Sequence, residues 1–183
     1  MFDIIFRMLA DGDSVVPAAG MQAISDQLAT RLPAGTIRLE TPVVSATANS
    51  LTIDGGERIE HDAVVVATEG PAASALLGLP KVASKAVGCV YFAANAAPTK
   101  TKLVILDGTG NGPVLNVAVM SNIAPSYAPK GRHLIAAAMP GHADGDLATV
   151  ARRQLRSWWG AQVDTWDHID TYRIAHGQPG QQP

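Results

Sequence analysis

A single cysteine, Cys89, is present among the 183 residues, so the chain cannot form an internal disulfide. It lies in an apolar run over residues 87–92, and no second cysteine accompanies it as a metal ligand. The five histidines are never spaced as metal ligands either, so the sequence predicts no metal site. We predict instead a buried, unreactive thiol in a protein of the reducing cytoplasm.

Charged residues are scarce: they make up 16% of the chain, and the net charge is only -2. A nucleic-acid-binding protein needs a basic surface to neutralise phosphates, so we expect no nucleic-acid partner. No apolar run approaches the roughly 20 residues that a membrane-spanning helix needs, and we expect no such span. A G-x-S-x-G motif is missing as well, which argues against Ser/His/Asp hydrolysis.

Hydrophobic residues, by contrast, reach 47% of the chain, with a mean hydropathy of +0.12. Residues 37–69 are typical of a strand, a hairpin and a further strand, because Asp54-Gly55-Gly56 supplies a turn that tolerates positive φ. The apolar run over residues 63–67 predicts a strand buried on both faces of a sheet. Residues 71–77 then predict a short helix that ends at Gly78.

Beyond residue 80 the pattern changes to strand-length apolar segments separated by turns, with no long helix between them. Such a pattern predicts an antiparallel sheet, with strands within residues 87–92, 103–106, 114–120 and 134–139. Closely spaced glycines in residues 108–112 invite comparison with a phosphate-binding loop. Because Pro113 and a strand follow them instead of a helix, we interpret them as a strand connector.

Two amphipathic helices are also predicted. From Pro17, apolar residues recur at helical spacing, at Met21, Ile24, Leu28 and Leu32. Near the other end, Asp146 caps a helix with one apolar face that ends at Gly160, and its other face carries three solvent-exposed arginines, Arg152, Arg153 and Arg156. Residues 2–6 fit a strand or part of a helix, and the tail from residue 176 is too rich in Gly, Gln and Pro to fold alone.

Several motifs occur in the order found in one flavoprotein family. They are P-x-x-G-M, E-T-P-V-V and D-A-V-V-V-A-T-E, at residues 17–21, 40–44 and 62–69, followed by Tyr91-Phe92 and residues 119–121 and 171–174. This ordered set resembles the middle of an FAD-dependent amine oxidase or phytoene desaturase-type flavoprotein. The family's G-x-G-x-x-G turn and its closing Gly-Asp segment do not occur here, so the resemblance implies an internal or truncated segment with an incomplete FAD site.

The resemblance also implies roles for particular residues. The main chain at one position and three residues after the buried strand are implied to contact FAD, namely Val43, Ala67, Thr68 and Glu69. Three aromatic residues are implied to line the substrate cavity, namely Tyr91, Phe92 and Tyr172. The alternative is that these residues simply pack in sheet and core, as most aromatic residues do. No catalytic residue is assigned.

The predicted fold is α+β, with partial FAD-binding-domain strands and an antiparallel or mixed sheet with covering helices. The resemblance divides the chain into a substrate-domain helix region at residues 1–36, a partial FAD-binding segment at residues 37–69 and a substrate-binding domain at residues 70–183. In the amine-oxidising branch a lysine follows the V-Y-aromatic strand. Ala93 occupies that position here, which favours a desaturase or other dehydrogenase.

The implied function is therefore that of part of an FAD-dependent oxidoreductase acting on a small molecule. Because the phosphate-binding turn is missing, we expect the chain alone to bind FAD weakly and to be inactive. The apolar edge at residues 63–67 would favour self-association. The alternative, from another class, is a non-catalytic binding or protein-interaction module that keeps the substrate-domain architecture.

Overall fold

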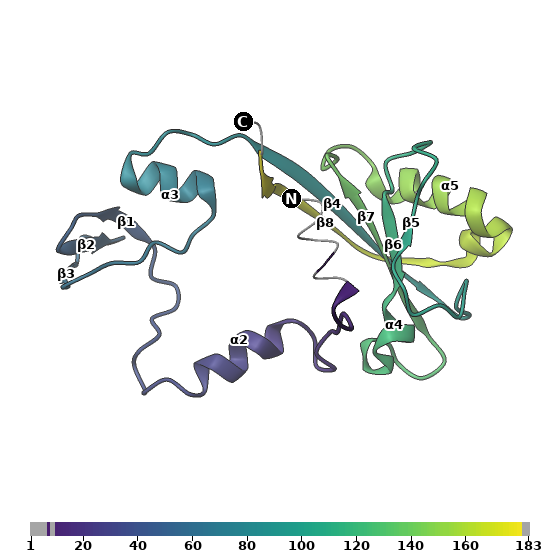
Figure 1. Cartoon of the computed structure of the whole chain (residues 1–183), viewed down its shortest axis with the longest axis horizontal. Coiled ribbons are helices and arrows are strands. Elements are labelled where there is room, and N and C mark those ends of the chain that lie inside the picture. The colour runs from purple at the N-terminus through teal and green to yellow at the C-terminus, as the bar shows by residue number, and fades with distance from the viewer. Residues whose placement is uncertain (1–6, 8–9, 181–183) are drawn as a thin grey trace.

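The structure is a computed structural model that describes residue 7 and residues 10–180. Within them the strands form two antiparallel sheets, one in the order β1-β2-β3 and one in the order β5-β6-β7-β4-β8. Figure 1 shows the small sheet with helix α3 at one end and the larger sheet with helix α5 at the other. The predicted α+β fold is confirmed. The prediction for residues 2–6 lies outside the described residues.

The small sheet forms around the predicted hairpin. Strands β2 (Ser50–Ile53) and β3 (Arg58–Glu60) pair antiparallel, and β1 (Val43–Ala46) pairs with the other edge of β2. The turn uses Gly55 and Gly56 at φ 93° and 88°, a region that side chains with a Cβ rarely adopt. Helix α3 (Gly70–Leu77) lies against β1 and ends at Gly78, with φ 65°. The predicted hairpin and helix are confirmed.

The prediction of a buried strand at residues 63–67 is wrong for this structure. These residues pair with no strand among those that the structure describes, and Val65 is 88% exposed. A strand that is buried on both faces needs hydrogen-bonded neighbours and covering helices. The described part of the chain places neither beside this run, so its apolar composition alone does not make it a strand.

The larger sheet contains the predicted strands and one more. They are β4 (Ser84–Ala94), β5 (Ile105–Leu106), β6 (Asn116–Val119), β7 (His133–Pro140) and β8 (Asp167–Pro179), and every pairing is antiparallel. Strand β8 extends into the tail that was predicted not to fold alone, because Pro179 lies opposite Ser84 and Gln178 opposite Lys85. Pairing with β4 thus orders residues whose composition disfavours structure.

Helix α5 (Leu147–Trp159) covers one face of this sheet, followed by the 3-10 helix η2 (Gly160–Thr165). As predicted, the Asp146 carboxylate accepts a hydrogen bond from the Thr149 N–H, at 3.0 Å, and Gly160 ends the helix. Between α5, η2 and the sheet lies one core, formed chiefly by Val90, Phe92, Val117, Ile135, Met139, Ala151, Leu155, Val163 and Trp166. Each large side chain buried there stabilises the fold by about 1.5–3 kcal/mol.

The three arginines of α5 do not share a solvated face. Arg153 and Arg156 are exposed, and Arg156 pairs with Asp164. Arg152 instead donates hydrogen bonds to the carbonyls of Val163 and Trp166, at 2.6 and 2.8 Å. It therefore holds η2 against α5, which corrects the prediction for this residue.

Helix α2 (Gln22–Ala29) confirms the predicted helix near the start of the chain, but no residue of it is buried. The apolar side chains that predicted it are exposed, by 47% to 61%, at Met21, Ile24, Leu28 and Leu32. We call the larger sheet with the short helix α4 (Met120–Ile123), the 3-10 helix η1 (Pro125–Tyr127), α5 and η2 the larger lobe. The chain ahead of α2 is held on this lobe, next to η1, which follows α4. There the Tyr127 hydroxyl donates to the Pro17 carbonyl at 2.7 Å. None of the helices in residues 10–180 is long and apolar enough to cross a membrane.

Candidate functional site

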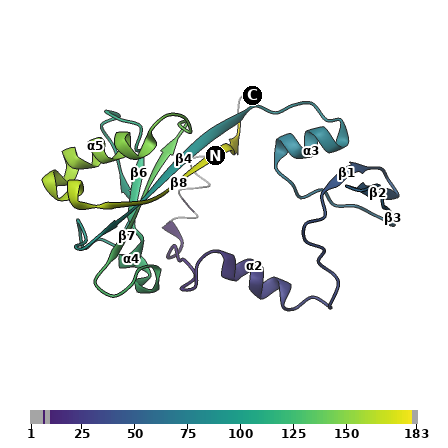
Figure 2. The same cartoon turned by 180° about the vertical axis from the view of Figure 1, so that it is seen from behind.

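Within the part of the chain that the structure describes, the larger sheet has one covered face and one open face. Along β4, Gly88, Val90, Phe92 and Ala94 are buried under α5, whereas the residues between them are only partly buried. Figure 2 shows α5 on one side of the sheet and α2, α3 and the small sheet on the other. We call the second side the open face. It carries Val87, Cys89, Tyr91 and Ala93 of β4 and their partners in register on β7 and β8.

Two of the predicted cavity residues meet on the open face. Tyr172 of β8 lies opposite Cys89, and its ring stands edge-on to that of Tyr91, with the ring centroids 5.6 Å apart. Tyr172 is 54% exposed. On the other side of β4, Cys89 and Tyr91 lie opposite the alanines 138 and 136 of β7, so small side chains leave room above the strand.

Cys89 and Tyr91, at the centre of this face, are uncharged near pH 7. Burial first, and then the neighbouring Cys89 and Tyr172, raise the pKa of Tyr91 to about 12. Burial also raises the pKa of the Cys89 thiol, and a hydrogen bond with Tyr91 lowers it by less. Cys89 is partly exposed, so the prediction that it is buried is wrong. The sheet has no covering layer on this side within the described residues, which sequence alternation cannot reveal.

Phe92, the third predicted cavity residue, lies on the opposite face. It is fully buried, its ring centroid is 5.9 Å from that of Trp166, and the Arg152 guanidinium lies 5.0 Å above it. Adjacent residues of a strand point to opposite faces, so Tyr91 and Phe92 cannot line the same side of the sheet. The structure therefore makes Phe92 a core residue, which corrects the implied role.

The four positions implied as FAD contacts all lie in the smaller lobe, which consists of the small sheet, α3 and the connector between them. Val43 begins β1, which is the edge strand of the small sheet, and it is 39% exposed. Ala67, Thr68 and Glu69 form the exposed connector that leads into α3. Because α3 lies against β1, both groups belong to one lobe, while Tyr91 and Tyr172 belong to the other.

A cavity of about 320 Å³ links Glu69 to the larger sheet. Its lining also includes Ser84, at the start of β4, and His176, near the end of β8. No sequence pattern predicted these two residues, because Ser84 and His176 become neighbours only through the long-range pairing of β4 with β8. The cavity is the place where the connector after residue 67 and the open-face strands meet.

The described residues fit part of an FAD molecule. An edge strand such as β1 has backbone N–H and C=O groups free to meet an adenine edge, and the small side chains of Ala67 and Thr68 in the exposed connector permit close approach. A pyrophosphate needs a glycine-rich turn at a helix N-terminus. In residues 10–180 the glycines of residues 108–112 join β5 to β6, as predicted, and serve no such turn. The fit is therefore partial, and it concerns the adenine end of FAD.

A family model described as flavin containing amine oxidoreductase matches residues 1–181. No curated protein sequence matches the chain. A candidate protoporphyrinogen oxidase from Exiguobacterium sp. 255-15 superposes with a TM-score of 0.71 at 17% identity, covering 88% of this chain and 40% of that one.

Two further solved structures share the fold. Reduced UDP-galactopyranose mutase superposes with a TM-score of 0.68 at 14% identity, covering 87% of this chain and 39% of that one. An oxidoreductase from Methanosarcina mazei superposes with a TM-score of 0.63 at 15% identity, covering 85% of this chain and 42% of that one. Identities this low show the fold alone. The chain spans about 40% of the length of these structures.

Proposed function

Because the chain belongs to the flavin-containing amine oxidoreductase family, we propose that its larger sheet forms the substrate-facing wall of an FAD-dependent oxidoreductase. The family resemblance predicted from the motifs is thereby confirmed, and so is FAD as the cofactor that the family implies. One observation carries the proposal. The sheet is packed against α5 on one face, while the other face is open and presents the Tyr91–Tyr172 pair.

In this proposal FAD, when bound, supplies the acceptor for the substrate's hydride. The chain's own residues bind and orient the substrate. Tyr91 and Tyr172 offer ring surfaces at 79° to each other, and the phenol of Tyr91 stays protonated, so it can donate a hydrogen bond but carries no charge. The alanines 136 and 138 of β7, opposite β4, have short side chains, so a substrate can approach the backbone of the strand closely.

Ala93 favours dehydrogenase or desaturase chemistry over amine oxidation. It follows Tyr91 on the open face, opposite Leu134 of β7 and Asp167 of β8. An alanine neither supplies positive charge nor holds a water molecule there. This part of the proposal depends on the alignment of Ala93 with the lysine of the amine-oxidising branch. Substantial peroxide production from simple amines by an FAD-loaded form of the protein would contradict it.

For the cofactor we propose that Val43, Ala67, Thr68 and Glu69 contact FAD from the smaller lobe. We also propose the division into residues 1–36, 37–69 and 70–183, with the first and last segments forming one substrate domain. The hydrogen bond from Tyr127 to the Pro17 carbonyl supports grouping the start of the chain with the larger lobe, whereas the packing of α3 against β1 favours a boundary after α3 instead of at residue 69. The absence of a phosphate-binding turn in the described residues supports weak FAD binding by this chain alone.

The test measures flavin absorbance in the purified chain, alone and fused behind a dinucleotide-binding βαβ segment. We expect little bound FAD in the first and near-stoichiometric FAD in the second. In the fusion, Tyr172→Ala should weaken substrate binding and leave FAD content unchanged, whereas Leu103→Ala, at an exposed residue outside the open face, should change neither. A fusion that folds and binds no FAD would refute the proposal.

A second function, that of a protein-interaction module, is favoured by the exposed apolar side chains of the smaller lobe. Val44, Val65, Leu79 and Val82 are each at least 50% exposed. Exposed apolar side chains are typical of an interface when they form a contiguous patch. Light scattering after size exclusion tests for self-association, and a chain that stays monomeric at high concentration would contradict the interaction module. The flavin content of the fusion then distinguishes the module from the enzyme.

A further inference from the structure

A second candidate site lies at the end of α5, on the covered side of the larger sheet. A cavity of about 380 Å³ is lined there by Thr99, Thr101, Ile105, Leu106, Asp107, Gly108, Thr109, Trp158 and Trp159. This volume is in the range of small-molecule sites. Among the lining residues Asp107 is the only charged one, and the two tryptophans are the only aromatic ones.

The walls of this cavity are held in place by specific hydrogen bonds. The Gln154 side chain of α5 bonds both backbone groups of Val114, accepting from the N–H at 2.8 Å and donating to the carbonyl at 2.9 Å. It also donates to Asp107, at 3.1 Å. On the opposite wall, the Asn122 amide donates to the carbonyls of Thr99 and Thr101, at 2.8 and 3.0 Å. The cavity is thus built by contacts between distant segments.

The carboxylate of Asp107 is fixed and ionised. One oxygen accepts hydrogen bonds from the side chain and the N–H of Thr109, at 2.7 and 2.9 Å, and these bonds hold the pKa of Asp107 below its ordinary value. The other oxygen accepts from Gln154. The Gly110 N–H also lowers the pKa of this carboxylate, so we expect a ligand to share the oxygen that accepts from Gln154.

The two tryptophans stand nearly perpendicular, with ring centroids 5.6 Å apart and an interplanar angle of 77°. Both are partly exposed, and Trp158 also lines the neighbouring cavity of about 400 Å³ on the other side of Thr109. The faces of indole rings and a carboxylate both carry negative electrostatic potential, and all three groups are among the lining residues. This combination attracts an organic cation, which loses little hydration on entering. Lys100 and Lys102 flank Thr101 in sequence, but both are exposed and neither lines the cavity.

We propose that this cavity binds a small organic ammonium ion, held by the indole rings of Trp158 and Trp159 and by the carboxylate of Asp107. The site is separate from the open face, because α5 covers the opposite side of the sheet. It is also independent of flavin, so it stands whether or not the proposed oxidoreductase function is correct. A primary amine would bind less tightly than a quaternary one, because it keeps a stronger hydration shell.

The test titrates the 183-residue chain with choline and with 3,3-dimethylbutan-1-ol, which replaces the cationic nitrogen by carbon. Calorimetry should show saturable, millimolar binding of choline and at least about tenfold weaker binding of the neutral alcohol. Trp158→Phe should weaken choline binding severalfold, because indole is the better cation-binding ring. Equal binding of the two compounds, or no binding of choline, would overturn the proposal.

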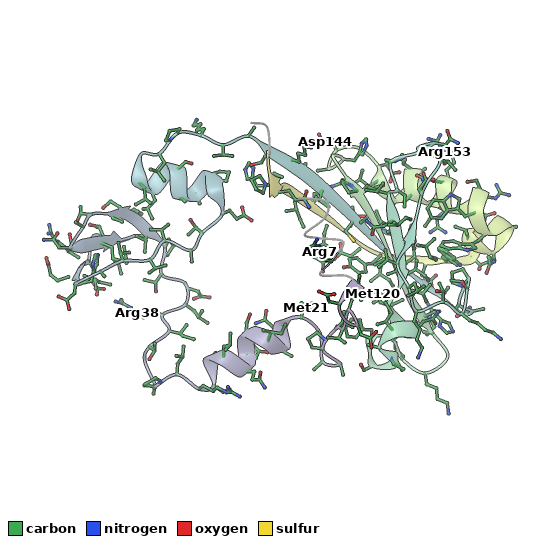
Figure 3. The ribbon with its side chains drawn as sticks, in the orientation of Figure 1. Arg7, Met21, Arg38, Met120, Asp144 and Arg153 are labelled. Atoms are coloured by element: carbon green, nitrogen blue, oxygen red, sulfur yellow. The ribbon has the colours of Figure 1, made fainter. Side chains whose placement is uncertain are left out.

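Asp107→Asn removes the charge and keeps an amide oxygen that can accept from Thr109, while its NH2 group replaces the oxygen that accepted from Gln154. We expect at least about fivefold weaker choline binding. The matched control is Asp144→Asn, which removes the same charge from the exposed loop ahead of α5 (Figure 3). Thirteen residues of helix, about 20 Å, separate that loop from the tryptophans, so binding should not change. If Asp107→Asn unfolds, Trp158→Phe decides, and unchanged binding in a folded variant of either kind refutes the site.

Discussion

Gln154 is the side chain on which the loop between β5 and β6 most depends. Its amide pairs with Val114 as a neighbouring strand would, and Val114 is fully buried, so no water can replace the lost partner. Replacing Gln154 by alanine leaves a buried N–H and a buried carbonyl unsatisfied, each costing about 1–3 kcal/mol. We therefore expect the free energy of unfolding of the larger lobe to fall by about 2–4 kcal/mol, allowing for relaxation of the loop.

Urea denaturation followed by tryptophan fluorescence measures this change, because all three tryptophans lie in residues 158–166. The matched control is Gln162→Ala. Its side chain makes one exposed hydrogen bond, to the Trp159 carbonyl, so the loss should stay below about 0.5 kcal/mol. Equal effects of the two substitutions would show that the Gln154 bridge does not hold the loop and would refute the reasoning.

Three further predictions follow from close contacts and titrations. Gly88→Ala should destabilise the larger lobe by about 1–3 kcal/mol, because its Cβ would lie 2.5 Å from the His142 carbonyl oxygen, whereas Gly108→Ala, with open space around it, should be nearly neutral in thermal unfolding. Because the folded-state pKa of Tyr91 is raised to about 12, its stabilising contribution should be complete below pH 10 and be lost as the pH rises to 12, and Tyr91→Phe should flatten that part of the stability curve. Because burial raises its pKa, Cys89 should react with a thiol reagent several times more slowly than an unfolded thiol at pH 8, and a rate equal to that of the urea-unfolded chain would contradict this.

Sequence patterns predicted the local elements well where their cause is local. The Asp54-Gly55-Gly56 turn, the end of α3 at Gly78 and the Asp146 cap of α5 each depend on the backbone preference or hydrogen bond of one or two residues. The antiparallel sheet could also be predicted, because short connectors between apolar segments leave little room for crossover helices. Structure then adds the register that sets Cys89 opposite Tyr172.

The candidate site was predictable only in part, because its arrangement depends on which face of a strand is covered. Alternation along β4 shows that Tyr91 and Phe92 point in opposite directions, but it does not show which of them meets α5. The same limit explains Cys89, which has the same apolar neighbours in sequence whether or not a layer covers it. The prediction of a strand at residues 63–67 is wrong for a related reason, since a strand depends on pairing with a neighbour and not on composition alone.

The two lobes differ in what holds them together, and this difference bears on both proposed functions. In residues 84–166 the apolar side chains enclose a core, so the wall bearing Tyr91 has its own support. In residues 10–83, which comprise α2 and the chain around it as well as the smaller lobe, Ile53 is the single hydrophobic residue that is buried, although the segment is rich in leucine and valine. Helix α2 and residues 63–67 therefore gain little from burial within the described chain. Any surface that covers them would strengthen their order. The proposed FAD binding by the smaller lobe should therefore depend on such a partner far more than ligand binding by the larger lobe does.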